Sequence, residues 1–341
     1  MKKKYIDLLK EMVAAGNLSG YTEEAESIFL REASSLGLLC GRDVLGNVSA
    51  KIPASEDRLT HYKPKNIMIC SHHDTHGHLV YRVNDDGTFD LGTASLEHAE
   101  GKEGIIRTLY GIVPILFFDV DEDAGTAKAS PADDSIDYSV VSEGDVVTLK
   151  PWVEERPRGK FSGTFLDNKV GCLATIMLME KLVKAKYREH NIFIVHTSYE
   201  ETSGYGIKAA VEKINPLFVI NVDMGPVEAL GQLGKGPIIY IGPIFNRVLT
   251  DLAKSICIDL KIPHTIEVCA TESSSDLDFV PPLNGGTPVC ELSYPGTNYH
   301  SFEERVSKRD IERLVKLLYS MCDKVQHIQS YSPSIGGLNE L

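Results

Sequence analysis

The chain has 341 residues, 48 of them acidic and 35 basic, and its formal net charge is −13. This length allows about two domains and a large buried core, but the negative charge argues against a nucleic-acid partner, which needs clustered Lys and Arg. The apolar stretches are too short to cross a bilayer, so we expect no membrane partner either.

The N-terminus begins with a short basic run, Lys2 to Lys4, which is followed by Asp7 and Lys10 rather than by an apolar core. This pattern predicts an amphipathic first helix and not a secretion signal. The seven cysteines are odd in number, scattered, and include no CxxC pair. Reduced, buried thiols and a cytoplasmic location fit this usage best.

The first part of the chain predicts a helix over 22–37, with Thr22 as its N-cap, and a buried parallel strand over 66–70. From residue 78 to about 155 there is no sustained helical period. Short alternating runs occupy 78–83, 105–120 and 145–153, with turn signals between them. We therefore predict a small all-β domain at 79–158, inserted into a catalytic domain formed by residues 1–78 and 159–341.

The second part of the chain alternates between helical and strand patterns. Helices are predicted from Asp167, over 204–213, over 244–260 and from Ser307, where Asp310 completes a variant capping box; strands are predicted over 192–195, 218–222, 264–268 and 288–292. This alternation indicates an α/β fold with a mixed, mainly parallel sheet flanked by helices.

Polar side chains stand at the ends of several of these predicted elements. In chain order they are His72 and Asp74, Asp167, Glu200 and Glu201, Asp223, and His300. Ligands of open α/β sheets bind at the carboxyl ends of the strands, so we expect these residues to share one site.

Histidine nitrogen and carboxylate oxygen together suit zinc, cobalt or manganese. Two such ions polarise a scissile carbonyl and lower the pKa of a shared water, and a further carboxylate must accept the proton of that water. Glu200 and Glu201 can fill both roles, because adjacent side chains of an extended chain point to opposite sides. The pattern predicts a two-metal hydrolase.

The order His72-x-Asp74, Leu166-Asp167, Glu200-Glu201, Val222-Asp223 and Pro295 to His300 resembles the glutamyl or tetrahedral aminopeptidase family of co-catalytic zinc peptidases. Asp43-x-Leu45-Gly46-Asn47 and Gly144-Asp145 also resemble that family, so the likeness covers nearly the whole chain. It implies a zinc-exopeptidase-like fold in which the β insertion is a dimerisation domain. It also implies homo-oligomers, either dimers or tetrahedral dodecamers.

The resemblance further implies a role for each residue of the set. His72 would bind one metal, His300 would bind the other, and Asp167 would bridge them; Glu201 and Asp223 would complete the two sides, Asp74 would orient His72, and Glu200 would be the general base. The expected activity is the removal of N-terminal residues from short peptides with two divalent ions, most simply Zn²⁺, with Co²⁺ or Mn²⁺ as other choices. The chain departs from the family pattern beside the ligands, at Thr75, Asn168 and Ser274-Ser275.

Two other functions stay open at this point. The run Asp74-x-His76-x-His78 matches the DxHxH opening of amidohydrolase barrels, where His76 and His78 would bind metal in a deacylase. A non-catalytic oligomeric relative is the second. Individually, Asp167 could be a helix cap, Asp223 a turn cap, Glu200-Glu201 a solvated pair and His300 a loop residue. The roles of His73, His76 and His78 are not fixed.

Overall fold

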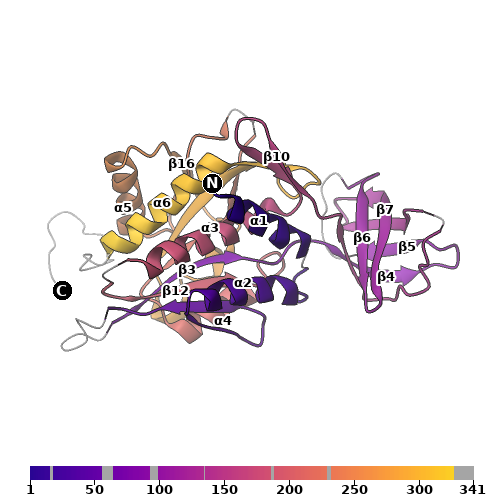
Figure 1. Ribbon diagram of the computed structural model, residues 1–341, viewed down its shortest axis with the longest axis horizontal. Coiled ribbons are helices and arrows are strands. Elements are labelled where there is room, and N and C mark those ends of the chain that lie inside the picture. The colour runs from indigo at the N-terminus through magenta and orange to yellow at the C-terminus, as the bar shows by residue number, and fades with distance from the viewer. Residues whose placement is uncertain are drawn as a thin grey trace.

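The computed structural model describes residues 1–15, 18–55, 64–92, 99–133, 135–185, 188–228 and 232–325. A helix-covered sheet forms the larger part, and a small barrel lies at one end of the long axis (Figure 1). The six α-helices of these residues are α1 (Lys3–Ala15), α2 (Glu23–Ser35), α3 (Leu166–Val183), α4 (Tyr205–Ile214), α5 (Arg247–Asp259) and α6 (Lys308–Lys324). Each lies where apolar residues recur at helical spacing, so the predicted helices are confirmed.

A long sheet runs through the larger part. Its strands follow the order β1 (Leu39–Arg42), β2 (Val48–Ile52), β12 (Asn191–Thr197), β3 (Asn66–His72), β13 (Val219–Asn221), β17 (Val289–Thr297), β18 (Glu304–Ser307), β11 (Lys160–Gly163) and β10 (Val153–Arg156). Off this path, β14 (Met224–Pro226) and β15 (Ile238–Ile241) pair with β17, and β16 (Thr265–Val268) pairs with β15.

The sheet is mixed, as predicted, with a parallel centre and antiparallel pairs toward both edges. The central strands β12, β3, β13 and β17 are parallel neighbours. Toward both edges the pairs β1–β2, β2–β12, β17–β18, β18–β11 and β11–β10 are antiparallel. Buried strands at the centre read as continuous apolar runs, which is the pattern that signals parallel pairing. The short edge strands carry no such signal.

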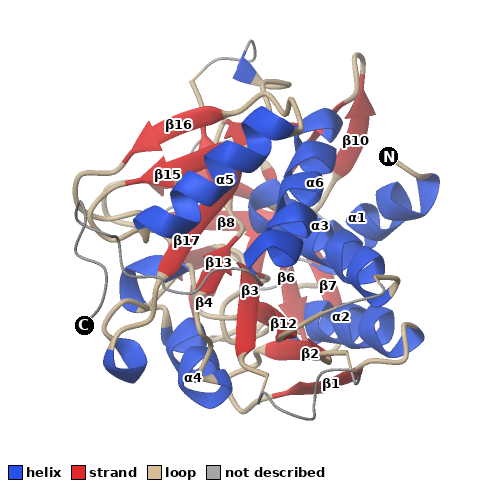
Figure 2. Cartoon of the chain, turned by 90° about the vertical axis from the view of Figure 1, so that its left-hand side faces the viewer, coloured by secondary structure: helices blue, strands red, loops and turns tan. Residues whose placement is uncertain are grey.

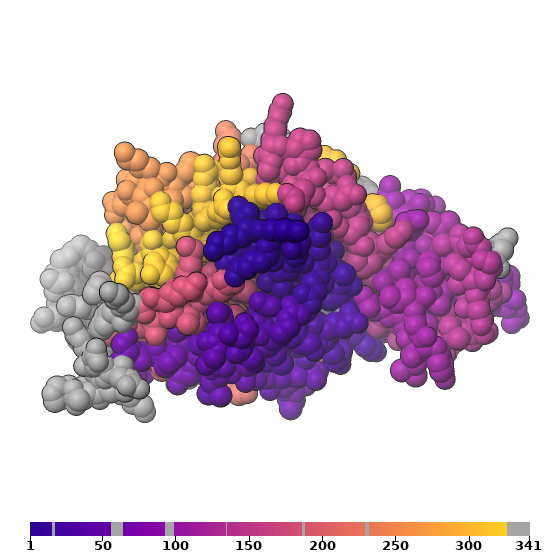
Figure 3. Space-filling view, in the orientation of Figure 1, coloured from indigo at the N-terminus to yellow at the C-terminus, as the bar shows by residue number. Residues whose placement is uncertain are grey.

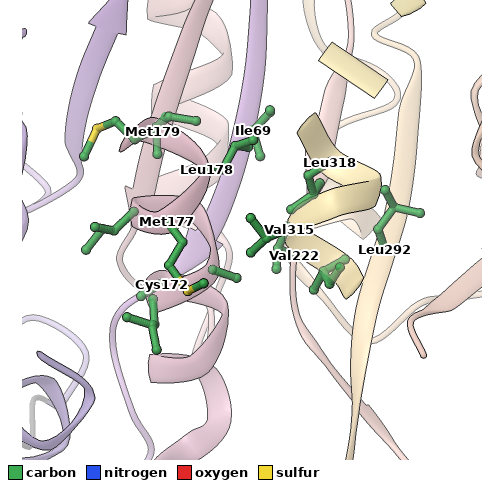
Figure 4. Packing of buried hydrophobic residues seen from close by; sticks show 14 of the residues in the cluster. Ile69, Cys172, Met177, Leu178, Met179, Val222, Leu292, Val315 and Leu318 are labelled. Carbon is green, nitrogen blue, oxygen red and sulfur yellow. The ribbon is translucent and has the colours of Figure 1, made fainter. Parts of the chain in front are cut away.

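Helices cover both faces of the sheet. Helices α1, α2, α3, α5 and α6 contribute to one apolar cluster, and α4 contributes to another that includes Val195 and Val289. Helix α3 lies at the centre of the first layer, where its Met177, Leu178 and Met179 belong to the same core as Val315 and Leu318 of α6 (Figures 2 and 4). Helix α3 is buried on almost every side, so the residues at its N-terminus are packed within the protein.

The barrel is formed by β4 (His78–Val83), β5 (Phe89–Gly92), β8 (Thr126–Pro131), β7 (Gly111–Asp121), β6 (Glu103–Thr108) and β9 (Val146–Leu149), which close on themselves. It has its own core, which includes Phe89, Ile115 and Phe117. The apolar run at 105–120 divides into two strands of a hairpin, β6 and β7. In the space-filling view the barrel forms a lobe beside the larger part (Figure 3).

Two predicted helix caps are wrong. Thr22 makes no cap bond to α2; its hydroxyl donates to Glu26 Oε1 instead. Ser307 makes no cap bond to α6, and Asp310 accepts from the backbone N–H groups of Gly234 and Gly236. The partner of Thr22 is local, because Glu26 belongs to the first turns of α2 itself. The partners of Asp310 are distant in the sequence, so there a tertiary contact takes the place of the local cap.

All seven cysteines are free; five are buried, while Cys40 and Cys269 are partly exposed, so the expectation of buried thiols holds for only five of them. Among the described residues, no helix combines the length and the apolar character needed to cross a membrane.

Candidate metal centre

The register of the central strands brings the predicted site residues to one level. Thr197 of β12 pairs with His72 at the end of β3, and Asn221 of β13 pairs with Cys70. Asp223, two residues after Asn221, therefore lies level with His72. Polar side chains lie close together at this end of the sheet because the parallel strands all have their carboxyl ends there.

Asp167 lies between two histidines. Its Oδ1 is 3.3 Å from His72 Nε2, and its Oδ2 is 3.3 Å from His300 Nε2. Asp167 and Asn168 have non-helical backbone angles at the start of α3, so Asp167 stands before the regular helix and is not part of its first turn. The carboxylate is 1% exposed and faces a histidine on each side.

Each histidine has a further carboxylate beside it. His72 Nε2 is 3.4 Å from Asp223 Oδ1 and 3.8 Å from Glu200 Oε2. On the other side, His300 Nε2 is 3.6 Å from Glu201 Oε2. The structure thus brings together all five residues predicted to bind metal, with Glu200 beside them.

These distances fit divalent cations. Zinc–ligand bonds of 2.0–2.1 Å place two donors of one tetrahedral ion about 3.3 Å apart. Asp167 Oδ1 and His300 Nε2 are buried and have no hydrogen-bond partner among the described residues, although each lies close to an oppositely charged group. Donor atoms that the protein itself leaves unsatisfied, at this spacing and of this chemical type, suit zinc or a similar ion.

Burial and neighbouring charges shift the pKa values of the residues in the cluster. Burial raises the pKa of Glu200 well above its usual value and that of Asp223 to about 6. Burial alone would lower the pKa of His300, but its close approach to Asp167 and the other nearby carboxylates raise it to about 9. These crowded carboxylates share protons with the histidines. A bound cation would stabilise their ionised form and take the place of those protons.

Asp74 connects the two sides of the cluster. It is fully buried, and its Oδ1 is 3.6 Å from His72 Nδ1. Its carboxylate accepts from Ser19 Oγ at 2.6 Å and from the backbone N–H groups of Glu200 and Glu201 at 3.3 Å. One side chain therefore lies beside the His72 ring and holds the turn that carries both glutamates, while the backbone carbonyl of Asp74 lies 3.3 Å from His72 Nδ1.

Glu200 and Glu201 do not lie in extended chain, contrary to the prediction. They follow β12 in a turn, directly after Tyr199 with a positive φ of 65°. The turn still directs the two side chains to different sides, Glu200 to His72 and Glu201 to His300. The separation of the two side chains was predicted, but the backbone geometry behind it was not.

Two supporting residues were not predicted from the sequence. Glu304 is fully buried and accepts from the backbone N–H groups of both Asp167 and His300. Asn168 donates to Val222 O, beside Asp223, and accepts from Tyr294 OH. Neither stands directly after a predicted strand, so the signal that found the other residues could not find these.

The histidine tract divides into different environments. His76 lies beside Glu201 and His300, whereas His78 begins barrel strand β4 and packs near Phe117. Burial lowers the pKa of His73 to about 3 and that of His78 to about 4, so both are neutral. The amidohydrolase hypothesis requires His76 and His78 as one metal pair on an α/β barrel. This chain has an all-β barrel and a mixed sheet instead, which excludes the α/β barrel.

A cavity of about 1220 Å³ adjoins the cluster. Asp223 and Tyr299 form part of its wall near the candidate ligands. Glu291, a buried carboxylate whose pKa burial raises to about 8, lines it farther along. The cavity gives the cluster room for a bound molecule.

Known proteins that resemble this chain in sequence or fold include several aminopeptidases. Lysyl aminopeptidase of Pyrococcus furiosus is 23% identical, over 94% of this chain and 97% of its own length. Among solved structures, an aminopeptidase from Desulfurococcus kamchatkensis has a TM-score of 0.83 at 19% identity and covers 94% of this chain and 95% of its own. The TET1 peptidase of Pyrococcus horikoshii has a TM-score of 0.78 at 20% identity, with 93% of this chain and 99% of its own covered.

A family model matches residues 46–317, which is most of the chain and includes every residue of the cluster. The matched segment also contains the barrel, so the family likeness is not limited to the sheet. The chain belongs to the M42 glutamyl aminopeptidase family.

Proposed function

We propose that this metal-dependent aminopeptidase removes N-terminal residues from short peptides at a centre of two divalent ions. Family membership makes the chain a hydrolase of peptide bonds. The observation that carries the two-ion centre is Asp167, whose two carboxylate oxygens each lie 3.3 Å from a different histidine. A carboxylate in that position can bridge two cations.

In this proposal His72 and Asp223 hold one ion, Glu201 and His300 hold the other, and Asp167 is shared. Zinc is the favoured metal, and cobalt or manganese would also suit this donor set. When bound, such ions polarise the scissile carbonyl and supply an activated water.

Glu200 is the proposed general base. Its Oε2 is 3.8 Å from His72 Nε2, and it lies close to the His72 and Asp223 pair without being one of the two nearest partners of Asp167. Burial raises its pKa well above the usual value, which suits a carboxylate that must take up a proton and then release it to the leaving amine. Asp74 positions this base through the backbone N–H group of Glu200.

For the assembly we propose a homo-oligomer, a dimer or a dodecamer, formed through the insertion at 79–158, which holds nearly all of the barrel. The support is an exposed apolar surface on the barrel: Tyr81 is 72% exposed, Leu109 96%, Tyr110 81% and Ile112 55%. Side chains of this kind mark an interaction surface. The TET1 peptidase of P. horikoshii, according to its description, assembles into a tetrahedron or an octahedral shell. Reduced thiols favour a cytoplasmic location.

A panel of chromogenic aminoacyl substrates tests the function. The purified chain would be freed of metal, loaded with zinc, cobalt or manganese, and compared with a chelator-treated sample. Activity that depends on added metal and on a free N-terminal amine supports the proposal. Cleavage of N-acetylated substrates at the same rate would contradict it, because that result indicates a deacylase or an endopeptidase.

A further inference from the structure

His76 lies in the short connection between β3 and the barrel, on the side of the cluster that carries Glu201 and His300. Its Nδ1 is 3.4 Å from Glu201 Oε1, and its ring centroid is 4.4 Å from that of His300, at an interplanar angle of 44°. The side chain is 5% exposed, and its Nε2 is buried with no hydrogen-bond partner among the described residues. A buried imidazole in contact with two candidate ligands needs a physical explanation.

A hydrogen bond alone does not explain this contact well. A charge-assisted bond between imidazole and carboxylate has an N···O distance of about 2.7–2.9 Å, so 3.4 Å is long. The same distance matches two donors on one tetrahedral ion, which lie about 3.3 Å apart. Donor atoms of His76, Glu201 and His300 all lie within 4.8 Å of one another, which is close enough for one cation.

We propose that His76 is an additional ligand of the ion on the Glu201 side, where it joins Glu201, His300 and the shared Asp167. This inference rests on the two-ion centre proposed above and deepens it. The Glu201 side then offers two imidazoles, whereas the His72 side offers one. Because imidazole suits zinc and cobalt better than manganese, the Glu201 side should discriminate against manganese more strongly.

The alternative is a positioning role, in which His76 only donates a hydrogen bond to Glu201. Two variants separate the roles. His76→Ala removes both the ligand and the donor, whereas His76→Gln keeps an N–H donor of similar reach but supplies no imidazole. His78→Ala is the matched control, because His78 is a buried imidazole of the same tract that lies outside the cluster.

The experiment uses the full chain and measures zinc and cobalt affinities by competition with a chromophoric chelator. Zinc X-ray absorption then compares the imidazole contribution per ion, and thermal unfolding checks that each variant is folded. Loss of an outer partner of a metal ligand costs roughly 10–100-fold in affinity, so loss of a ligand should exceed about 100-fold at one of the two sites. We expect this loss in both His76 variants, with a weaker imidazole signal, and wild-type behaviour in His78→Ala.

Wild-type metal affinity and an unchanged imidazole signal in His76→Gln would overturn the inference and leave His76 as a positioning residue. That result is distinct from failure of the proposed function. If the wild-type chain itself bound no ions, the two-ion centre would be wrong. If it bound two ions and the His76 variants bound both equally well, only the role of His76 would be wrong.

Discussion

The two sides of the proposed metal centre are built differently. On one side, His72 ends β3 and Asp223 follows β13, which flanks β3 in the sheet; Glu200 reaches this side from the turn that it shares with Glu201 after β12. On the other side, Glu201 lies in a turn and His300 in a loop with a positive φ of 56°. The His72 side chain is 2% exposed, whereas that of His300 is 22% exposed.

This contrast shows two ways to fix a ligand. The sheet register positions the His72 side directly, because neighbouring strands end at the same level. On the Glu201 side, the loop that carries His300 is held by other contacts. Glu304 accepts hydrogen bonds from the backbone N–H groups of Asp167 and His300. Buried carboxylates that hold backbone groups can replace a strand as the support of a site.

The largest effect should come from Asp167→Asn, which removes the charge that the two sides share. A neutral amide is a weak ligand, so we expect both ions to bind poorly and turnover to fall at least about 10⁴-fold, corresponding to several kcal/mol of metal-ion catalysis. Metal analysis after dialysis, together with the activity assay, checks this. Retention of two ions per chain would show that Asp167 is not the bridge.

Glu200→Gln should be the next most severe change and should act on chemistry alone. We expect turnover to fall about 10²–10⁴-fold, the usual contribution of a general base, with metal content unchanged because both histidines and Asp167 remain. Metal analysis and steady-state kinetics on the same sample measure both quantities. Near-normal activity would remove Glu200 from the role of base.

The fold could be predicted from the sequence where the signal is local. Helices such as α3 and α6 and central strands such as β3 have apolar patterns that persist over many residues, and they lie where expected. Short edge strands and helix caps depend on tertiary neighbours instead. Asp310 is an example: its carboxylate binds the loop at Gly234 and Gly236 and not its own helix.

The site was predictable to a similar extent, and for a related reason. Residues directly after predicted strands, such as His72 and Asp223, could be assigned because all parallel strands of a sheet end at one edge. Glu304 and His76 escaped assignment because their contacts depend on loop geometry, which no local pattern encodes. Sequence therefore indicates the candidate ligands on both sides, Glu201 and His300 included, but not the contacts that support the loop-borne side.

A matched pair of variants tests whether the anchors are specific to each side. Glu304→Gln disturbs the backbone bonds of Asp167 and His300, while Asp74→Asn disturbs the orientation of His72 and the glutamate turn. We expect each to weaken metal binding about 10–100-fold, the usual effect of an outer partner. The first should affect mainly the ion at His300, and the second the ion at His72. Equal loss of both ions in both variants would contradict separate anchoring.

The pH dependence of stability should reflect the crowding of the whole centre. Asp223, with a pKa of about 6, and His300, with a pKa of about 9, both lie above their ordinary values. At these two groups the folded metal-free chain binds more protons than the unfolded chain, so their contribution to stability should fall as pH rises from about 4 to about 9.

Bound metal replaces those protons, so the rise in Tm caused by zinc should be larger at about pH 8.5 than at about pH 5.5. Calorimetry with and without zinc at several pH values measures this difference. The control is His78→Ala, which changes a buried histidine outside the cluster. A zinc effect that stays constant across this range would argue against shared protons in the metal-free centre.

The smallest effect on the centre should come from the barrel surface. Ile112 is 55% exposed on β7, so Ile112→Asp should leave folding, metal content and turnover per chain close to wild type. If this surface forms the subunit contact, a buried charge there should cost about 2 kcal/mol, which weakens association about 30-fold. Sedimentation at several concentrations measures that change. Thr126→Asp adds the same charge at an exposed polar position of β8 and should leave assembly intact. Equal association of both variants would place the subunit contact elsewhere. Loss of metal in Ile112→Asp would show that metal binding on the loop-borne side of the centre depends on the barrel as well as on Glu304.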